Sequence, residues 1–302
     1  MSSLNVEDMH QPAFHDQQAR KQKQTQSLTS HTSKMYGHFT FKHGKTILQD
    51  KYHQGSLKIS KTHRMNNHTP QLTVCMMDAS PGMLEGDCYD LNFTLEEHTA
   101  VYLTNQSSTK IHPKHPDGMG CKLKQHITLK NHSCLEYVPE GTVPYAGSVL
   151  DATSTFHLEK GAALFLSDIV TPGRVYLGEQ FDYESITTKL NVFLDHELIA
   201  WDTFHLVPQQ HDVGGSSAFA HYTHVGSVWI FGHVASDTLL HMLRPHLPQC
   251  HEVMTGASLL HTYGLCIRIL GKNTWQIQQV IRQVWNIWKL MQHEYPTSEI
   301  WK

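Results

Sequence analysis

The sequence lacks the features that mark several common classes of protein. Its 302 residues contain no apolar run near the roughly 18 residues that a transmembrane helix requires. The first residues, MSSLNVEDMHQP, lack the apolar core of a signal peptide. No basic stripe accompanies the formal net charge of −3, so nucleic acid is not an expected partner. We therefore expect a cytoplasmic protein that binds neither membrane nor nucleic acid.

Cysteine pairs of the metal-binding or redox type are also missing. The six cysteines include no C-x-x-C pair: Cys75, Cys88, Cys121, Cys134, Cys250 and Cys266. Most of them lie inside apolar strand patterns, where free cysteine behaves as a small hydrophobic residue. Without an export signal, reduced thiols are expected rather than disulfides.

Common catalytic motifs are absent as well. No G-x-S-x-G sequence is present, which argues against a Ser/His/Asp hydrolase. None of the 25 histidines forms an H-E-x-x-H or H-x-x-x-H pair in a plausible helix. A metal-dependent enzyme on a β-sandwich or barrel is the alternative that these histidines leave open. It would need two or three histidines and a carboxylate on adjoining strands, whereas strand alternation gives His126 and His157 no common partner.

Residues 1–33 are rich in Gln, Ser, Thr and His and carry little apolar surface. Such a segment buries too little to offset the entropy lost on ordering, so we expect a disordered polar tail. A metal-gathering role through His10, His15 and His31 is the less favoured alternative. Residues 34–302 are expected to form a single β-rich domain.

Alternating apolar and polar residues predict strands through most of the chain. Two or three strands surround turns at His43-Gly44 and Gln54-Gly55, and residues 71–77 form another. From Leu91 a pattern repeats about every 30 residues: a strand, a short polar turn and a second strand ending in polar residues. We interpret the units, which begin at Leu91, His126, Thr155 and Leu190, as stacked hairpins, because no amphipathic helix separates their strands. The predicted fold is all-β and mainly antiparallel, with many strands in packed layers.

The second strands of the four units can be aligned on Ala100, Cys134, Ala163 and Leu198, which shows the face on which each polar end lies. By the two-residue period, Thr104, Glu136 and Asp202 then share one face. Asp168 is one residue out of phase, and a bulge would be needed to bring it round. Several carboxylates on one buried face would be costly unless they were paired or bound to a cation.

Two helices are expected near the end of the chain. The first is short, capped by Ser236 or Asp237 and broken at Pro245. The second, longer and C-terminal, is capped by Asn273, with Gln276 in the capping-box position. Its apolar stripe is typical of a buried helix face: Ile277, Val280, Ile281, Val284, Ile287, Trp288 and Met291.

Several motifs resemble, in order, those of one known family. They are the Gly86-Asp87 turn, TNQSSTKIH (104–112), LEYVPEGTVPYAGS (135–148), SDIVTPGR (167–174) with Gly178-Glu179, the Asp202 strand, and GLCIRILG before the last helix. Over roughly residues 36–291 the chain is similar to the UreD family of urease accessory proteins, called UreH in some organisms. The residues that lead into the Gly86-Asp87 turn, SPGMLEGD, differ from the glycine-rich sequence usual in the family. His112 occupies a position where the family often has an aromatic residue.

The resemblance implies a non-enzymatic chaperone of many β-strands and about two helices. It implies assembly with UreF, the GTPase UreG and apo-urease, and transient carriage of nickel into the urease active site along interior polar and acidic residues. The acids that match the family's motifs are Asp87, Glu136, Asp168, Glu179 and Asp202. The matching polar run contains Thr104, Gln106, Ser107, Thr109 and Lys110, with His112 beside it. Within this stretch we expect Lys110 to form a buried ion pair with Asp87.

Overall fold

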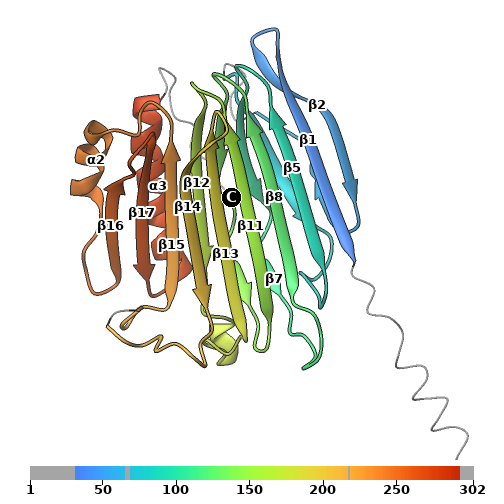
Figure 1. The fold of residues 1–302 in the computed structure, drawn as a ribbon, viewed down its shortest axis with the longest axis vertical. Coiled ribbons are helices and arrows are strands. Elements are labelled where there is room, and N and C mark those ends of the chain that lie inside the picture. Colours follow the sequence, from blue (N-terminus) through green and yellow to red (C-terminus); the bar gives the residue numbers. More distant parts are fainter. Residues whose placement is uncertain (1–30, 65–68, 217, 293–302) are drawn as a thin grey trace, which may run out of the picture. The chain divides into compact units, whose positions relative to one another are not determined.

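Two β-sheets and two helices account for the regular structure of the residues that the computed structural model describes, which are 31–64, 69–216 and 218–292 (Figure 1). The seven-stranded sheet contains, in spatial order, β14 (Glu197–Leu206), β13 (Ser185–Leu194), β11 (Val149–Leu158), β8 (Cys121–Leu129), β5 (Cys88–Leu95), β1 (Thr32–Lys42) and β2 (Lys45–Gln54). The ten-stranded sheet contains β16 (Val253–Leu259), β17 (Gly264–Gly271), β15 (His224–Phe231), β12 (Ala163–Val170), β9 (Cys134–Tyr137), β6 (Ala100–Asn105), β4 (Leu72–Asp78) and β3 (Leu57–Ile59), with β7 (Thr109–Ile111) and β10 (Thr142–Pro144) attached beside them.

The prediction of a mainly antiparallel fold is wrong, although the prediction of many strands with two helices is confirmed. Strands β1, β5, β8, β11 and β13 run parallel to one another, and so do β4, β6, β9 and β12. Antiparallel pairing is confined to the flanks, for example β1 with β2 and β13 with β14.

The repeating units explain this difference. In three of the four, the two strands belong to different sheets, so the unit is an arch and not a hairpin; only the β13–β14 unit folds back on itself. The connections 96–99, 130–133 and 159–162 each carry the chain from one sheet to the other, a gap of about 10 Å for packed sheets. Strands then pair with their counterparts in the next unit, as Asn92 does with His126, and His126 with Thr155. A two-residue period defines the faces of a strand but not its partner.

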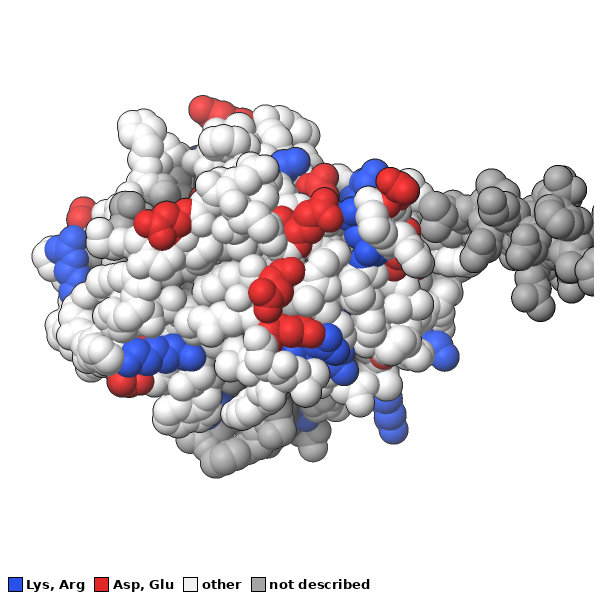
Figure 2. Space-filling model, turned by 90° about the horizontal axis from the view of Figure 1, so that it is seen from below, with Lys and Arg blue, Asp and Glu red and all other residues white. Residues whose placement is uncertain are grey.

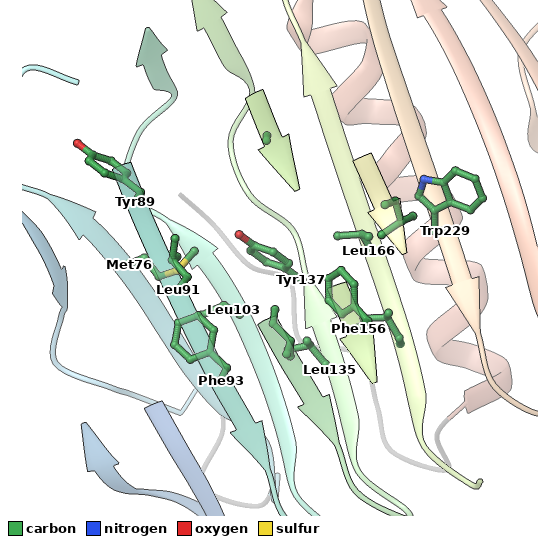
Figure 3. Packing of buried hydrophobic residues seen from close by; sticks show 14 of the residues in the cluster. Met76, Tyr89, Leu91, Phe93, Leu103, Leu135, Tyr137, Phe156, Leu166 and Trp229 are labelled. Carbon is green, nitrogen blue, oxygen red and sulfur yellow. The ribbon is translucent and has the colours of Figure 1, made fainter. Parts of the chain in front are cut away.

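The main hydrophobic core lies between the two sheets (Figure 3). Phe93 and Phe156 of the seven-stranded sheet pack in the same cluster as Leu103 and Leu135 of the other sheet. The large aromatic side chains are fully or almost fully buried, which makes this cluster the principal source of hydrophobic stabilisation.

A second core lies on the opposite face of the ten-stranded sheet, beneath the helices. Helix α3 (Thr274–Gln292) buries the predicted apolar stripe there, and the side chain of Trp288 is completely enclosed. The predicted cap is confirmed, because Asn273 Oδ1 accepts a hydrogen bond of 3.0 Å from the backbone N–H of Gln276. Helix α2 (Asp237–Leu243) has Ser236 as its N-cap and ends just before Pro245, as expected.

Some of the remaining predictions are confirmed, and others concern residues that the structure does not describe. The turn at His43-Gly44 joins β1 and β2, and all six cysteines are free thiols. Residues 1–30, and with them nearly all of the predicted disordered tail with His10 and His15, lie outside the described residues. So do residues 293–302 at the end of the predicted domain. Within the described ranges, no helix has both the length and the apolar character needed to cross a membrane.

Candidate site in the space between the sheets

The space between the sheets is not filled completely by hydrophobic side chains. Two small cavities, of about 100 Å³ and 130 Å³, lie there. They share six wall residues, which are Leu123, Gln125, Tyr137, Pro139, Thr142 and Asp168. A water molecule occupies about 30 Å³ in the liquid, so each cavity is large enough for water. The two cavities are therefore adjacent and partly polar, and we call the pair the central cavity.

Asp168 stands where the two parts of the central cavity meet. It lies on β12, near the middle of the ten-stranded sheet, and keeps some accessible surface because it lines the cavity wall. Burial raises the pKa of its carboxyl group, and the charge of Asp202 adds to this. The backbone N–H of Ile169 and the charge of Arg268 act in the opposite direction. Asp168 is therefore a carboxylate placed deep in the fold, where a cation would lower its free energy.

At one end, the central cavity is bordered by an ion pair that joins the two sheets. Arg268 of β17 donates hydrogen bonds to Asp202 of the edge strand β14 and, at 2.8 Å, to Ser227 Oγ of β15. Its guanidinium carbon lies 4.9 Å from the centre of the Trp229 ring, a cation–π contact. Arg268 thus pairs directly with Asp202, and its charge also acts on Asp168.

At the other end, the cavity is bordered by the predicted polar run. Gln106, Ser107, Thr109 and Lys110 all lie on its wall. Thr104 is buried and donates a hydrogen bond of 2.7 Å to the backbone carbonyl of Val138, so its hydroxyl joins neighbouring strands. His112 lies outside the cavity wall, where its ring packs 4.8 Å from that of Tyr145.

The predicted buried ion pair between Lys110 and Asp87 is wrong. Lys110 is exposed, and Asp87 Oδ2 instead accepts a hydrogen bond of 2.8 Å from the backbone N–H of Leu84 within its own turn. The sequence analysis missed two carboxylates on the cavity wall at this end, Asp78 and Glu140. Glu140 accepts a hydrogen bond of 2.8 Å from Gln278. Asp78 accepts hydrogen bonds from Ser80 Oγ (2.6 Å) and the Tyr89 hydroxyl (2.7 Å). Burial would raise the pKa of Asp78, but these hydrogen bonds outweigh it and lower the pKa.

Glu136 lies on the opposite face of the ten-stranded sheet, away from the central cavity. Its completely buried carboxylate accepts hydrogen bonds from Gln71 (2.8 Å) and from the Trp285 indole (2.9 Å). Lys289 of α3 places its ammonium group 3.2 Å away. Burial raises the pKa of Glu136, and Lys289 opposes this. The whole arrangement ties helix α3 to the sheet.

The predicted common face for Glu136 and Asp202 is therefore wrong. The alignment of Ala100, Cys134 and Ala163 is confirmed by the strand register, but Leu198 belongs to the other sheet. Asp168 lies on the opposite face of the sheet from Glu136 and therefore faces the cavity. The pairing of β12 has no register shift, so no bulge brings Asp168 round to the face of Glu136.

Glu179 also lies apart from the central cavity. It forms a two-pronged ion pair with Arg174, of which the Nε contact is 2.7 Å. This hydrogen bonding to Arg174 lowers the pKa of Glu179. Arg174 in turn stacks 3.9 Å above the Tyr145 ring, so Glu179 fixes a surface loop.

Sequence reasoning overlooked three further polar residues of this region: Gln125, Arg268 and Lys289. A signal existed for two of them, because Arg268 interrupts the apolar strand GLCIRILG and Lys289 follows Trp288 within the last helix's apolar pattern. Among the residues described, no three His, Cys, Asp or Glu side chains meet closely enough to hold a metal ion. The ligand set that a metal-dependent enzyme would require is thus not found in that part of the chain.

Comparison with known proteins adds an independent line of information. Residues 33–302 match the family model described as UreD urease accessory protein. The chain is 30% identical over 255 residues to the urease accessory protein UreD of Acetivibrio thermocellus, covering 84% of this chain and 96% of that protein. It is 32% identical over 243 residues to UreD of a Bacillus species, covering 80% and 87% of the two chains.

Proposed function

The chain belongs to the UreD family of urease accessory proteins, and from this we propose that it is a scaffold through which nickel is delivered to apo-urease. It acts in the cytoplasm in a complex with UreF and the GTPase UreG, and it performs no catalytic chemistry of its own. Nickel is its transient cargo and not a resident cofactor.

One observation carries this proposal: of two adjacent cavities, one borders the polar run near Thr109 and the other borders the Arg268–Asp202 pair, and Asp168 lies on the wall of both. A divalent cation moving through a protein interior needs oxygen ligands to replace part of its water shell. Asp168, Gln125 and Thr142 offer such ligands on the wall that the two cavities share.

The type of ligand also suits transfer. Nickel is held firmly by imidazole and thiolate groups, whereas isolated carboxylates and hydroxyls bind it weakly. A path must release its cargo, so single carboxylates spaced along a cavity fit this role better than a cluster of histidines or cysteines would.

The acidic residues proposed from the sequence therefore divide into two groups. Asp168 and Asp202, which border the cavity, are assigned to the nickel path. Asp87, Glu136 and Glu179 lie outside the walls of the central cavity, have other polar partners and are assigned structural roles.

The test is urease activation at limiting nickel in cells that co-express urease, UreF, UreG and an Asp168→Asn variant of this chain. We expect the complex with UreF to remain intact and the activated fraction of urease to fall severalfold. Added nickel should restore part of the activity, because weak transit sites respond to concentration.

The matched control is Asp151→Asn, the same change on the exposed face of β11, where Asp151 lies 3.5 Å from Lys189. It should activate urease as the unaltered chain does. Activation by Asp168→Asn that equals this control at limiting nickel would rule out the interior path.

A further inference from the structure

Strand β9 is too short to fill its place in the middle of the ten-stranded sheet. It pairs with β6 on one side and with β12 on the other, and both ladders end at Tyr137. Toward β12, strand pairing resumes only where Val170 meets Thr142 of β10. No described residue pairs with residues 167–169 on that side of β12. The sheet is therefore interrupted between residues 138–141 and 167–169, and we call this interruption the strand gap.

The sequence explains why β9 ends at this point. The chain continues as VPEG (138–141), and its proline has no backbone N–H with which to extend a ladder. Side-chain hydrogen bonds hold the segment to β6 instead. The Thr104 hydroxyl donates to the Val138 carbonyl at 2.7 Å. Asn105 Oδ1 accepts a hydrogen bond from the backbone N–H of Glu140. The segment thus borders the strand gap on the side of β6, and β12 borders it on the other.

A third cavity lies between the ten-stranded sheet and helix α3, on the side of the sheet away from the central cavity. Its volume is about 430 Å³, within the usual range for ligand pockets, and we call it the helix groove. Trp275 and Asn286 of α3 lie on its wall and are exposed, so the groove opens to solvent. Arg282, a cation on the same wall, is also exposed, and solvent and salt screen its charge.

Three residues at the strand gap lie on the walls of cavities on both sides of the sheet. Pro139 lines the helix groove and both parts of the central cavity. Glu140 lines the groove and the part of the central cavity that borders the polar run. Ser167 lines the groove and the other part of the central cavity. The same few side chains therefore separate the helix groove from the central cavity.

Two of these side chains offer oxygen atoms to a cation. The carboxylate of Glu140 is partly exposed, and its Oε2 accepts a hydrogen bond of 2.8 Å from Gln278 of α3. The side chain of Ser167 is only 1% exposed, and its hydroxyl has no hydrogen-bond partner among the described residues. A buried hydroxyl in this state is stabilised by any polar or charged group that reaches it. A single carboxylate with a hydroxyl binds a divalent cation weakly, as transit requires.

The polar run lies at another side of the central cavity. Its strand β7 lies in the lower part of the view in Figure 1. Figure 2 shows the molecule from below, with acidic side chains across the middle of this face. Carboxylates on a surface attract cations. The strand gap would give the central cavity a second access, on the helix side of the sheet.

We propose that the strand gap is a passage by which nickel crosses the ten-stranded sheet between the helix groove and the central cavity, with Glu140 as its carboxylate ligand and Ser167 as a hydroxyl ligand. This inference rests on the proposed function, because it adds an opening to the nickel path. Asp168 lies on the wall of the central cavity immediately after Ser167 in the sequence. A cation that passes Glu140 from the groove therefore meets a second carboxylate on the inner side.

The test measures urease activation against nickel concentration in cells that co-express urease, UreF, UreG and a Glu140 variant. Glu140→Gln keeps the length of the side chain and an oxygen that can accept the hydrogen bond from Gln278, but it removes the charge. We expect the nickel concentration for half-maximal activation to rise severalfold, with the maximum largely retained. Glu140→Asp keeps the carboxylate and should respond much as the unaltered chain does. Glu140→Lys places a positive charge in the passage and should lower activation more than Glu140→Gln.

Ser167→Ala tests the hydroxyl ligand. It removes a buried hydroxyl that has no partner among the described residues, so thermal unfolding should occur at the same temperature or higher. The nickel concentration for half-maximal activation should nevertheless rise, by a smaller factor than for Glu140→Gln. A response equal to that of the unaltered chain would remove Ser167 from the passage.

The matched control is Glu97→Gln, the same change at an exposed position in the turn 96–99, outside the walls of the groove and of the central cavity. It should activate urease as the unaltered chain does. Glu140→Gln should retain the complex with UreF and the thermal unfolding temperature, because its shape and hydrogen-bonding capacity are kept.

Asp168→Asn, measured in parallel, separates this inference from the proposed function. If Asp168→Asn impairs activation and the Glu140 variants behave like Glu97→Gln, the passage is wrong and the nickel path stands. If neither position affects activation, the interior path fails, and the passage fails with it. Loss of the UreF complex in Glu140→Gln, or equal impairment in Glu140→Asp and Glu140→Gln, would assign Glu140 a structural role and overturn the proposal.

Discussion

Glu136 and Asp168 lie on neighbouring strands of the same sheet, yet their carboxylates face opposite sides of it and have different surroundings. Glu136 faces helix α3, where Gln71, Trp285 and Lys289 surround it with hydrogen-bond donors. Asp168 faces the central cavity, and Arg268, whose charge acts on it, is paired with Asp202. A buried carboxylate with a full set of partners fixes structure, whereas one that borders a cavity remains able to bind something else.

The largest expected effect comes from breaking the helix-side arrangement. Lys289→Ala leaves the carboxylate of Glu136 buried without its cation, which typically costs about 3–5 kcal/mol. Urea denaturation should show this loss. The double change Lys289→Met with Glu136→Gln should recover most of it, because no charge then remains buried. A loss below about 1 kcal/mol for Lys289→Ala would mean that the two carboxylates do not differ as described.

Asp168→Asn should increase the stability of the protein at neutral pH, whereas Lys289→Ala decreases it. Burial raises the pKa of Asp168 above its ordinary value, so its contribution to stability is present below that ordinary value and is lost as pH rises through the folded-state pKa. The variant should therefore gain stability relative to the unaltered chain as pH increases from about 4 to 7. Urea midpoints measured across this range test the sign; a variant that becomes relatively less stable with rising pH would contradict it.

Arg268→Gln should have a smaller effect, since both members of the Arg268–Asp202 pair are partly exposed, by 44% and 24%. After allowance for solvent screening, we expect a loss of about 1 kcal/mol or less. The pKa of Asp168 should rise further, because Arg268 lowers it, and the pH-dependent difference of the preceding experiment should grow. Lys130→Gln, which alters the similarly exposed Lys130–Glu159 pair away from the cavity walls, is the control and should leave that pH dependence unchanged.

Lys110→Ala should have the smallest effect on stability. The residue is exposed, so its removal should change the free energy of unfolding by no more than about 0.5 kcal/mol. The sequence analysis instead predicted a buried ion pair with Asp87, and removing one member of such a pair typically costs about 3–5 kcal/mol. A change of several kcal/mol in urea denaturation would restore that earlier interpretation.

Local sequence patterns determined much of this protein. The alternation of side chains located the strands, and the spacing of about 30 residues located the repeating unit. The match of Ala100 with Cys134 and Ala163 was correct to the residue. The same alternation placed Glu136 and Asp168 on opposite faces, because successive side chains of a strand point in opposite directions. The stripe on α3 identified a buried helix face in the same way.

Only the tertiary structure decided which strands pair and which face of each strand borders the cavity. The turn 96–99 has the composition of a hairpin turn, but it crosses between sheets, because each strand completes its hydrogen bonds with the following unit and not with its own neighbour. That choice placed Asp202 in a different sheet from Glu136 and brought it to Arg268. It also set Glu136 against Lys289, which lies far along the chain. Periodicity is a property of one segment, whereas pairing and charge compensation depend on segments distant in sequence, so no local pattern could specify them.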